Sequence, residues 1–244
     1  MFEKAELMYE GKAKQIFAVT DNPDLVWMHF KNSLTAFNAE KKDEMDGKGE
    51  VNQKIASVIF RFLQSRGVET HFVDQIGDRD MVCQKVEIIP LEVVVRNTIA
   101  GSLAKKFGLA EGEDLQDPLT EFFYKKDELG DPFLSDEQAL MLGVSDSQEE
   151  LDEMKQSALK INQQLSEFFG KMNVRLVDFK VEFGRRPDGS ILLADEITPD
   201  SCRLWDKETG DKLDKDRFRR DLGRVLESYQ EIYSRIEAQW QEYL

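Results

Sequence analysis

Residues 174–197 constrain the fold more than any other part of the sequence. They predict two strands, 174–183 and 191–197, which are joined by the turn sequence Arg186-Pro187-Asp188-Gly189. The second strand begins with Ile191-Leu192-Leu193-Ala194, and such an apolar run is typical of a strand that is covered on both faces. We therefore expect this hairpin to lie in the interior of a larger sheet.

The hairpin also brings charged side chains together. Side chains alternate between the two faces of a strand, so Asp178, Lys180 and Glu182 share one face of the first strand. The return strand runs directly into Asp195 and Glu196, and the turn predicts that Asp195 lies across from Glu182 within one residue of register. Two carboxylates beside a lysine suit Mg²⁺ that carries a polyphosphate. A solvated row of charges remains the alternative for the first strand considered alone.

A second candidate site is the sequence Tyr9-Glu10-Gly11-Lys12-Ala13-Lys14, which lies between two strand-like runs. A glycine lets backbone N–H groups approach a phosphate, and the lysines add positive charge. The patterns GxxxxGK[ST] and GxGxxG are both absent, so an ordinary hairpin turn remains the alternative.

A third candidate site follows the predicted strand 91–95. This strand delivers Arg96 to its end, and Gly101-Ser102 then opens a turn or a helix. An arginine, a serine hydroxyl and free N–H groups form a set that can bind a monophosphate. An arginine in a surface ion pair is the alternative, and Arg203 is a further cation that could reach the Asp195 site.

The rest of the chain predicts further strands first and helices later. We expect strands over 14–19 and 25–30 with a turn at 21–24, followed by a polar loop over 32–49. A helix over 51–63 that Gly67 stops, strands over 70–73 and 81–88, and loops with short helices over 111–143 come next. A helix over 151–168 follows a Ser147/Glu150 capping box, and one long helix covers 218–236. This order favours an α+β fold over regular βαβ repetition.

Composition narrows the classes of function. The 33 Lys and Arg residues against 48 Asp and Glu residues give a net charge of −15, which argues against nucleic-acid and anionic-membrane binding. Cys83 and Cys202 form no CxxC motif, and we read His29 and His71 as structural, so a disulfide framework or a zinc site is not expected. The charged start is not a secretory signal and no apolar run is long enough to span a membrane, so we expect a cytoplasmic protein.

Several motifs in order resemble those of the SAICAR synthetase family, from about Glu6 to Ile236. They are Tyr9-x-Gly11-Lys12-Ala13-Lys14, Ile89-Pro90-Leu91-Glu92 through Arg96 to Ala100-Gly101-Ser102, Val177-Asp178-Phe179-Lys180-Val181-Glu182-Phe183-Gly184, Asp195-Glu196-x-Thr198-Pro199-Asp200-x-x-Arg203-x-Trp205-Asp206 and Asp214-Lys215-Asp216-x-Phe218-Arg219. Two departures are conservative in size: Ala194 stands where the family commonly has glycine, and Cys202 where a small residue is usual.

The resemblance implies a fold and a reaction. The fold would be α+β and similar to ATP-grasp, with ATP between two sheet-containing subdomains, approximately residues 1–86 and 87–244. The reaction would join carboxyaminoimidazole ribonucleotide to L-aspartate through an acyl phosphate, with ATP and Mg²⁺ as cofactors, in purine biosynthesis. The partners would be small molecules and no nucleic acid or membrane, and a homodimer is compatible with the family.

The resemblance also implies roles for individual residues. It assigns ATP to Gly11, Lys12, Ala13, Lys14, Lys85, Val86, Glu87, Ile88 and Lys125. It assigns the ribonucleotide to Glu92, Arg96, Ser102, Asp178, Lys180, Arg203 and Arg219. It assigns Mg²⁺ to Glu182 and Asp195, and catalysis to these two residues with Lys180. The polar loop, with Thr35-Ala36-Phe37-Asn38, would border the aspartate site.

Two other functions use some of the same residues. A small-molecule kinase would stop at phosphoryl transfer, and ADP release that requires aspartate separates it from a ligase. A ligand-binding module without catalysis would require neither ATP nor Mg²⁺, and the row of Asp178, Lys180 and Glu182 with Asp195 counts against it.

Overall fold

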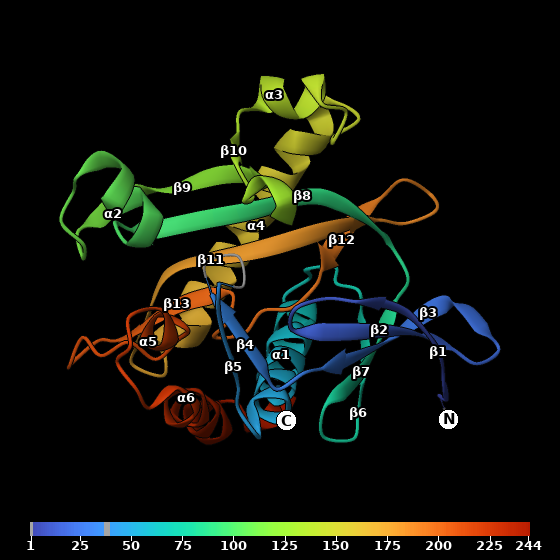
Figure 1. Ribbon diagram of the computed structural model, residues 1–244, viewed down its shortest axis with the longest axis horizontal. Helices are drawn as coiled ribbons and strands as arrows, with labels where there is room; N and C mark the ends of the chain where they lie inside the picture. Colours follow the sequence, from blue (N-terminus) through green and yellow to red (C-terminus); the bar gives the residue numbers. More distant parts are fainter. Residues whose placement is uncertain (1, 37–39) are drawn as a thin grey trace.

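The N-terminal part of the chain forms a five-stranded antiparallel sheet (Figure 1). The structure, a computed structural model, describes residues 2–36 and 40–244. The strand order is β1-β2-β3-β7-β6, and the strands are β1 (Lys4–Glu10), β2 (Lys14–Val19), β3 (Asn22–Phe30), β6 (Phe72–Ile76) and β7 (Asp80–Gln84). A short hairpin of β4 (Ser33–Ala36) and β5 (Lys41–Glu44) follows β3 in the chain and forms a separate two-stranded sheet.

The second sheet contains the predicted hairpin. Its order is β10-β9-β8-β11-β12, and β13 also pairs with β11; the strands are β8 (Glu87–Thr98), β9 (Asp114–Tyr124), β10 (Phe133–Leu134), β11 (Val174–Arg185), β12 (Ile191–Ala194) and β13 (Cys202–Asp206). Strand β8 occupies one edge of β11, while β12 and β13 share the other edge. Residues 195–201 leave the sheet between these two short strands, and this gap in the pairing creates room for a site.

Helices cover the sheets and join them into one core. They are α1 (Lys48–Ser65), α2 (Gly101–Phe107), α3 (Asp136–Met141), α4 (Gln148–Gly170), α5 (Asp216–Arg219) and α6 (Val225–Gln239), with the 3₁₀ turns η1 (Asp127–Leu129) and η2 (Gln241–Tyr243). The apolar stripe of α4 packs on β8 and β11, and α1 packs against α6 and the first sheet (Figure 1). Buried side chains of both sheets belong to one continuous hydrophobic cluster.

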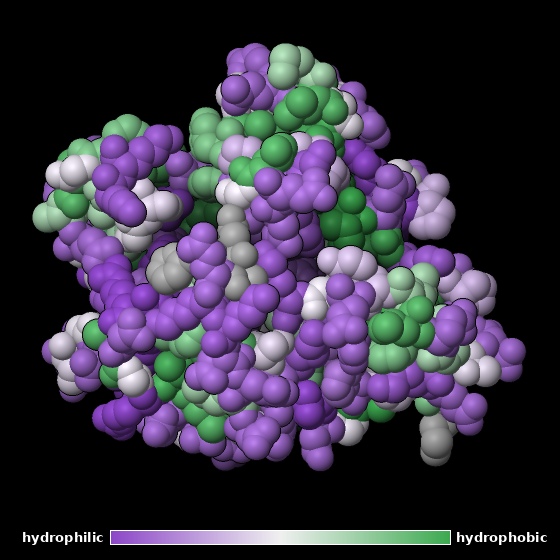
Figure 2. All heavy atoms as spheres, viewed as in Figure 1, coloured by the Kyte–Doolittle hydropathy of each residue, from purple (hydrophilic) through white to green (hydrophobic). Residues whose placement is uncertain are grey.

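The surface agrees with the acidic composition. Figure 2 shows a mostly hydrophilic face with an apolar group over α3 and β10. Leu140 and Met141 of α3 and Phe133 of β10 are exposed. Among the described residues, no helix is long and apolar enough to cross a membrane. Cys83 and Cys202 are both buried and carry free thiols.

The structure corrects two of the predicted strand boundaries in the first sheet. The turn between β2 and β3 is only Thr20-Asp21, because Val19 pairs with Asn22 and Asp21 takes a left-handed φ of 56°. Pro23 therefore lies in the first residues of β3, where no partner strand needs its missing N–H. The predicted strand 81–88 is two strands, β7 and β8, which separate at Lys85-Val86 and enter different sheets.

Two segments predicted as loops contain strands. Residues 32–49 form the β4–β5 hairpin and the start of α1, while the predicted Phe37 and Asn38 lie outside the described residues. Residues 111–143 contain the 11-residue strand β9. Its Pro118 lies where only β8 pairs with β9, so an edge without a hydrogen-bond partner accommodates the proline.

Three element ends also differ from the prediction. The long C-terminal helix is interrupted between α5 and α6, where Asp221, Gly223 and Arg224 have positive φ values. Strand β12 ends at Ala194 rather than at residue 197. The hydroxyl of Ser147 caps α4 as predicted, but the Glu150 carboxylate binds Arg185 instead of completing a capping box.

Candidate active site

The β11–β12 hairpin builds the centre of the site. Glu182 pairs with Ala194, so Asp195 follows within one residue of register, as predicted. Asp195 has a left-handed φ of 59°, which turns the chain out of the sheet at this point. On β11, the backbone N–H of Lys180 donates to the Ser201 carbonyl at 2.9 Å, which closes the far side of the gap.

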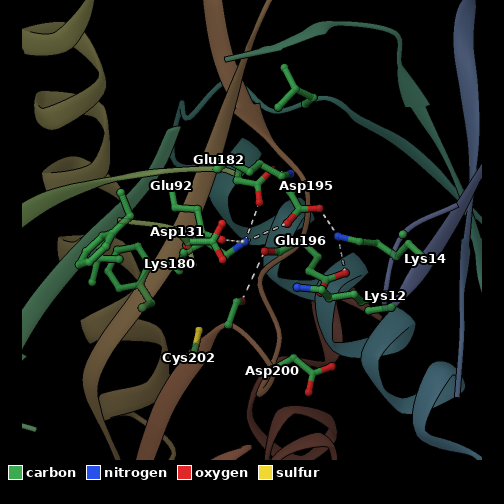
Figure 3. A pocket seen from close by; sticks show the side chains of 18 of the residues that line it. Lys12, Lys14, Glu92, Asp131, Lys180, Glu182, Asp195, Glu196, Asp200 and Cys202 are labelled. Carbon is green, nitrogen blue, oxygen red and sulfur yellow. Dashed lines mark hydrogen bonds and ion pairs between the residues drawn. The ribbon is translucent and has the colours of Figure 1, made fainter. Parts of the chain in front are cut away.

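Lysines bridge the carboxylates at this centre (Figure 3). The Lys180 Nζ lies 2.6 Å from Glu182 Oε1, 3.3 Å from Glu92 Oε1 and 3.5 Å from Asp195 Oδ2. Lys14, from the first sheet, pairs with Asp195 and lies 2.9 Å from Glu196 Oε2. The alternating charges of β11 are thus part of a buried network that both sheets supply, and not a solvated row.

The network sets the charge of its members. Burial alone would lower the pKa of Lys180, but Glu182, Asp195 and Glu92 raise it well above its usual value. Burial alone would raise the pKa of Asp195, but Lys14 and Lys180 hold it well below its usual range. Lys180 is therefore a fixed positive charge and Asp195 a fixed negative one.

His71 holds the backbone at the same point. Its Nε2 lies 2.9 Å from the Asp195 carbonyl oxygen, and its backbone N–H donates to the Leu193 carbonyl at 2.8 Å. Burial lowers the pKa of His71 to about 4. The neutral ring thus donates from Nε2 to the carbonyl, in the structural role that the sequence predicted.

A second cluster surrounds Arg96 at the end of β8. The Arg96 guanidinium donates to Glu121 at 2.6 Å, to Asp178 at 3.1 Å and to the Ser102 hydroxyl at 3.0 Å. Gly101, with a φ of +55°, begins α2 beside it. The predicted combination of an arginine and a serine hydroxyl is therefore present at one end of a helix.

Asp178 and Asp216 connect this cluster to the C-terminal part of the chain. Arg203 of β13 donates to Asp178 at 2.8 Å and to Asp216 at 3.0 Å, and Arg219 donates to Asp216 at 2.7 Å. Arg219 lies in the four-residue helix α5, so the predicted position in the first turn of a long helix is wrong. Its place beside Arg203 comes from the shared Asp216 instead.

Both clusters line one cavity of about 780 Å³. Of the eighteen residues that the resemblance assigns to ATP, the ribonucleotide, Mg²⁺ or catalysis, all except Glu87 line this cavity. The side chain of Glu87 is 79% exposed and lies 3.8 Å from Arg185. Lys125 reaches the centre by pairing with Glu182, and Lys12 pairs with Asp127 at 2.7 Å.

The comparisons with known proteins decide the family. A family model described as SAICAR synthetase matches residues 7–236. The phosphoribosylaminoimidazole-succinocarboxamide synthase of Clostridium botulinum (strain Alaska E43 / Type E3) is 53% identical over 234 residues, which are 96% of this chain and 99% of that protein. The chain belongs to the SAICAR synthetase family.

Solved structures of the SAICAR synthetase family agree with the fold. The synthase from Ehrlichia chaffeensis has a TM-score of 0.92 at 44% identity, over 96% of this chain and 99% of that chain. A SAICAR synthetase in complex with ADP has a TM-score of 0.91 at 44% identity, over 96% and 98%. The α+β fold is confirmed, and the chain is an ATP-dependent ligase of purine biosynthesis.

The structure adds residues to this SAICAR synthetase site that the sequence analysis did not assign. Asp200 and Lys215 line the cavity, although both were quoted only as parts of family motifs. Lys48 is 1% exposed and pairs with Asp200 at 2.5 Å. No local pattern distinguishes Lys48 from a surface lysine, so only its tertiary contacts could have identified it.

The carboxylates fit Mg²⁺. Lys180 lies within 3.5 Å of both Glu182 and Asp195, so one cation already bridges the two carboxylates. Among the described residues, no group of three metal-ligating side chains occurs. Mg²⁺ commonly takes only one or two carboxylates and completes its shell with water and substrate phosphates, and this pair matches that requirement.

Proposed function

We propose that this enzyme joins the carboxylate of carboxyaminoimidazole ribonucleotide to the amine of L-aspartate, with conversion of ATP to ADP and phosphate. One observation carries the proposal in a chain of this family. A single cavity holds the Glu182–Lys180–Asp195 network and, apart from it, the cluster of Arg96, Arg203 and their partners.

The chemistry requires two steps. A carboxylate is a poor acyl donor because its leaving group would be oxide. In the first step a carboxylate oxygen of the ribonucleotide attacks the γ-phosphorus, the bond to the β-phosphate oxygen breaks, and ADP leaves. In the second step the aspartate amine attacks the carbonyl carbon, phosphate leaves, and the nitrogen loses a proton. The product is SAICAR.

Residues near the Gly11 loop would bind the nucleotide. The backbone of Gly11 and Ala13 and the ammonium groups of Lys12, Lys14 and Lys125 line the cavity and would contact the ATP phosphates. Lys85 and Val86, which join β7 to β8, and Ile88 of β8 would contact adenine and ribose. For Glu87, the exposed side chain leaves only a backbone contribution to this proposal.

The arginine cluster would bind the ribonucleotide. Arg96, Ser102, Arg203 and Arg219 would converge on its phosphate. The carboxylates of Glu92 and Asp178 would accept hydrogen bonds from N–H or O–H groups of the ribonucleotide. Lys180 would orient the reacting carboxylate and stabilise the charge that develops as the phosphoryl group arrives. Its position between Glu182, Glu92 and Asp195 supports this role, because it is held in place by all three.

Glu182 and Asp195 would hold Mg²⁺. The ion would neutralise charge on the transferring phosphoryl group when it is bound. With Mg²⁺ present, the lysines that now pair with these carboxylates would be available to phosphate oxygens.

Further parts of the proposal concern organisation. We infer two subdomains that divide near residue 86, since β7 and β8 belong to different sheets and ATP would lie between them.

A cytoplasmic location agrees with the free thiols of Cys83 and Cys202. A homodimer is a separate proposal, which light scattering of the full chain tests.

An ADP-release assay tests the function. We expect ADP release that requires the ribonucleotide, Mg²⁺ and L-aspartate, together with formation of a product that contains both substrates. A kinase would sustain ADP release over many turnovers without aspartate and would form no amide. Absence of ADP release in every arm would contradict both enzymes.

A further inference from the structure

The cations that line the cavity differ in their counter-ions. Most have a carboxylate oxygen at 2.9 Å or less; they are Lys12, Lys14, Lys125, Lys180, Arg96, Arg203 and Arg219. For Lys215, the nearest carboxylate oxygen within the described residues is Asp200 Oδ1, at 3.9 Å. The Lys215 side chain is only 16% exposed, so water does not fully replace the missing partner.

Asp200 does not neutralise Lys215, because other groups already occupy its carboxylate. Lys48 lies 2.5 Å from Asp200 Oδ2, and Asn52 donates to the same oxygen at 2.8 Å. The Tyr229 hydroxyl donates to Oδ1 at 2.7 Å. The side chains of Lys48 and Asp200 are only 2% and 6% exposed, and they compensate each other's charge. One carboxylate thus faces two lysines, and Lys215 has no counter-ion of its own.

The surroundings of Lys215 connect it to both substrate clusters. Its backbone N–H donates to the Pro199 carbonyl at 3.0 Å, at the start of α5, and the side chain lines the same cavity as Arg219, Glu196 and Thr35 of β4. Burial lowers the pKa of Lys215; the charges of Asp200 and Glu196 oppose this effect, and those of Arg219 and Lys48 add to it. An anion bound here would stabilise the ammonium.

We propose that the Lys215 ammonium binds a carboxylate of the amino-acid substrate and thereby selects a dicarboxylic amino acid. The inference rests on the function proposed above. Phosphates of the nucleotide and the ribonucleotide have the lysines near Gly11 and the arginine cluster, respectively, as their cations. Lys85 also lines the cavity but is exposed, so Lys215 is the partly buried cation that remains for a third anion among the described residues.

The variant Lys215→Met tests the proposal, because methionine keeps much of the apolar stem and removes the charge. We expect the KM for L-aspartate to rise about 10- to 100-fold, as for loss of one hydrogen bond to a charged group. The KM for the ribonucleotide should change less than about 2-fold. Lys215→Arg should restore most of the aspartate affinity, and Lys212→Met, on the same segment but outside the cavity lining, should behave as the wild type.

A second measurement separates this proposal from the function itself. Hydroxylamine in place of aspartate traps the acyl phosphate, and Lys215→Met should form the trapped product at the wild-type rate. A raised KM for the ribonucleotide with an unchanged KM for aspartate would assign Lys215 to the phosphate and overturn the proposal, as would unchanged kinetics. If the wild type forms no trapped product, the acyl-phosphate function fails instead.

Discussion

At the scale of single residues, a substitution of Asp195 tests whether its carboxylate binds Mg²⁺. Asp195→Asn keeps the size and tolerates the left-handed φ of 59°, but it removes the charge that would hold Mg²⁺. We expect kcat to fall by a factor on the order of 10² or more, and the Mg²⁺ concentration for half-maximal rate to rise.

Asp188→Asn is the matched control, since Asp188 lies in the exposed turn of the same hairpin. It should retain wild-type kinetics and a wild-type thermal midpoint. Full activity of Asp195→Asn would refute the metal assignment.

Lys180 differs from a general base because its network keeps it charged. Lys180→Met removes this charge and should slow the first step by roughly 10²–10³, the usual cost of one preorganised donor. Single-turnover formation of the hydroxylamine-trapped product measures that step. If the variant forms the trapped product at the wild-type rate and fails only with aspartate, Lys180 acts on the amine instead.

Arg219 tests the phosphate cluster. It shares Asp216 with Arg203 and lines the cavity, so Arg219→Ala should raise the KM for the ribonucleotide about 10-fold or more. The KM for ATP should remain nearly unchanged, because the Gly11 loop that would bind ATP lies between β1 and β2 of the first sheet, whereas Arg219 lies in α5. Equal weakening of both substrates would mean that Arg219 serves the nucleotide or the fold.

At the scale of elements, the contact between β11 and the β7–β8 connection leaves no room for an added methyl group. A Cβ at Gly184 would lie 2.3 Å from Val86 Cγ2 and 2.8 Å from Val86 Cβ. Gly184→Ala should therefore destabilise the fold by about 1–3 kcal/mol and raise the KM for ATP, because Val86 lines the cavity. Chemical denaturation and steady-state kinetics measure the two effects.

Two further variants control for the change of residue type. Gly170→Ala meets only Lys207 Nζ at 3.5 Å and should cost no stability. Adding Val86→Ala to Gly184→Ala removes the closest atom and should recover part of the loss. Additive losses in the double variant would contradict the proposed clash.

Elements also explain where prediction succeeded. Helix α1 and helix α4 were predicted because a period of apolar residues is a local property. The strand β9 was missed because its charged, half-exposed residues lack a clear alternation, and only its pairing with β8 makes it a strand. The break before α6 was missed because its apolar stripe continues through Leu222, which is 47% exposed.

At the scale of the whole molecule, stability depends on pH through His71. Its pKa falls from 6.5 to about 4 on folding, so the unfolded chain binds a proton first as the pH drops. The contribution of neutral His71 is complete above pH 6.5 and is lost between pH 6.5 and about 4, to a total of about 3 kcal/mol. Asp214 has the opposite effect on the pH dependence of stability. Burial raises its pKa to about 7, so the folded chain binds this proton before the unfolded chain does as the pH drops.

The difference between wild type and His71→Gln isolates this effect. We expect the stability advantage of the wild type, measured by denaturant unfolding, to shrink by about 3 kcal/mol from pH 7 to pH 4. His29→Gln removes the other histidine and should leave the wild-type dependence in place. A pH-independent difference between wild type and His71→Gln would mean that His71 is not buried in neutral form.

The sequence by itself determined the β11–β12 hairpin, the register of Asp195 against Glu182, the main helices and the family. These depend on periodicity, turn chemistry and ordered motifs, which are read along the chain. Only the tertiary structure decided which charges meet. Lys14 and Asp195 are 181 residues apart, and Lys215 lacks a counter-ion because Lys48 occupies Asp200. Such pairings depend on three-dimensional distance and on competition for each carboxylate, and no local pattern contains that information.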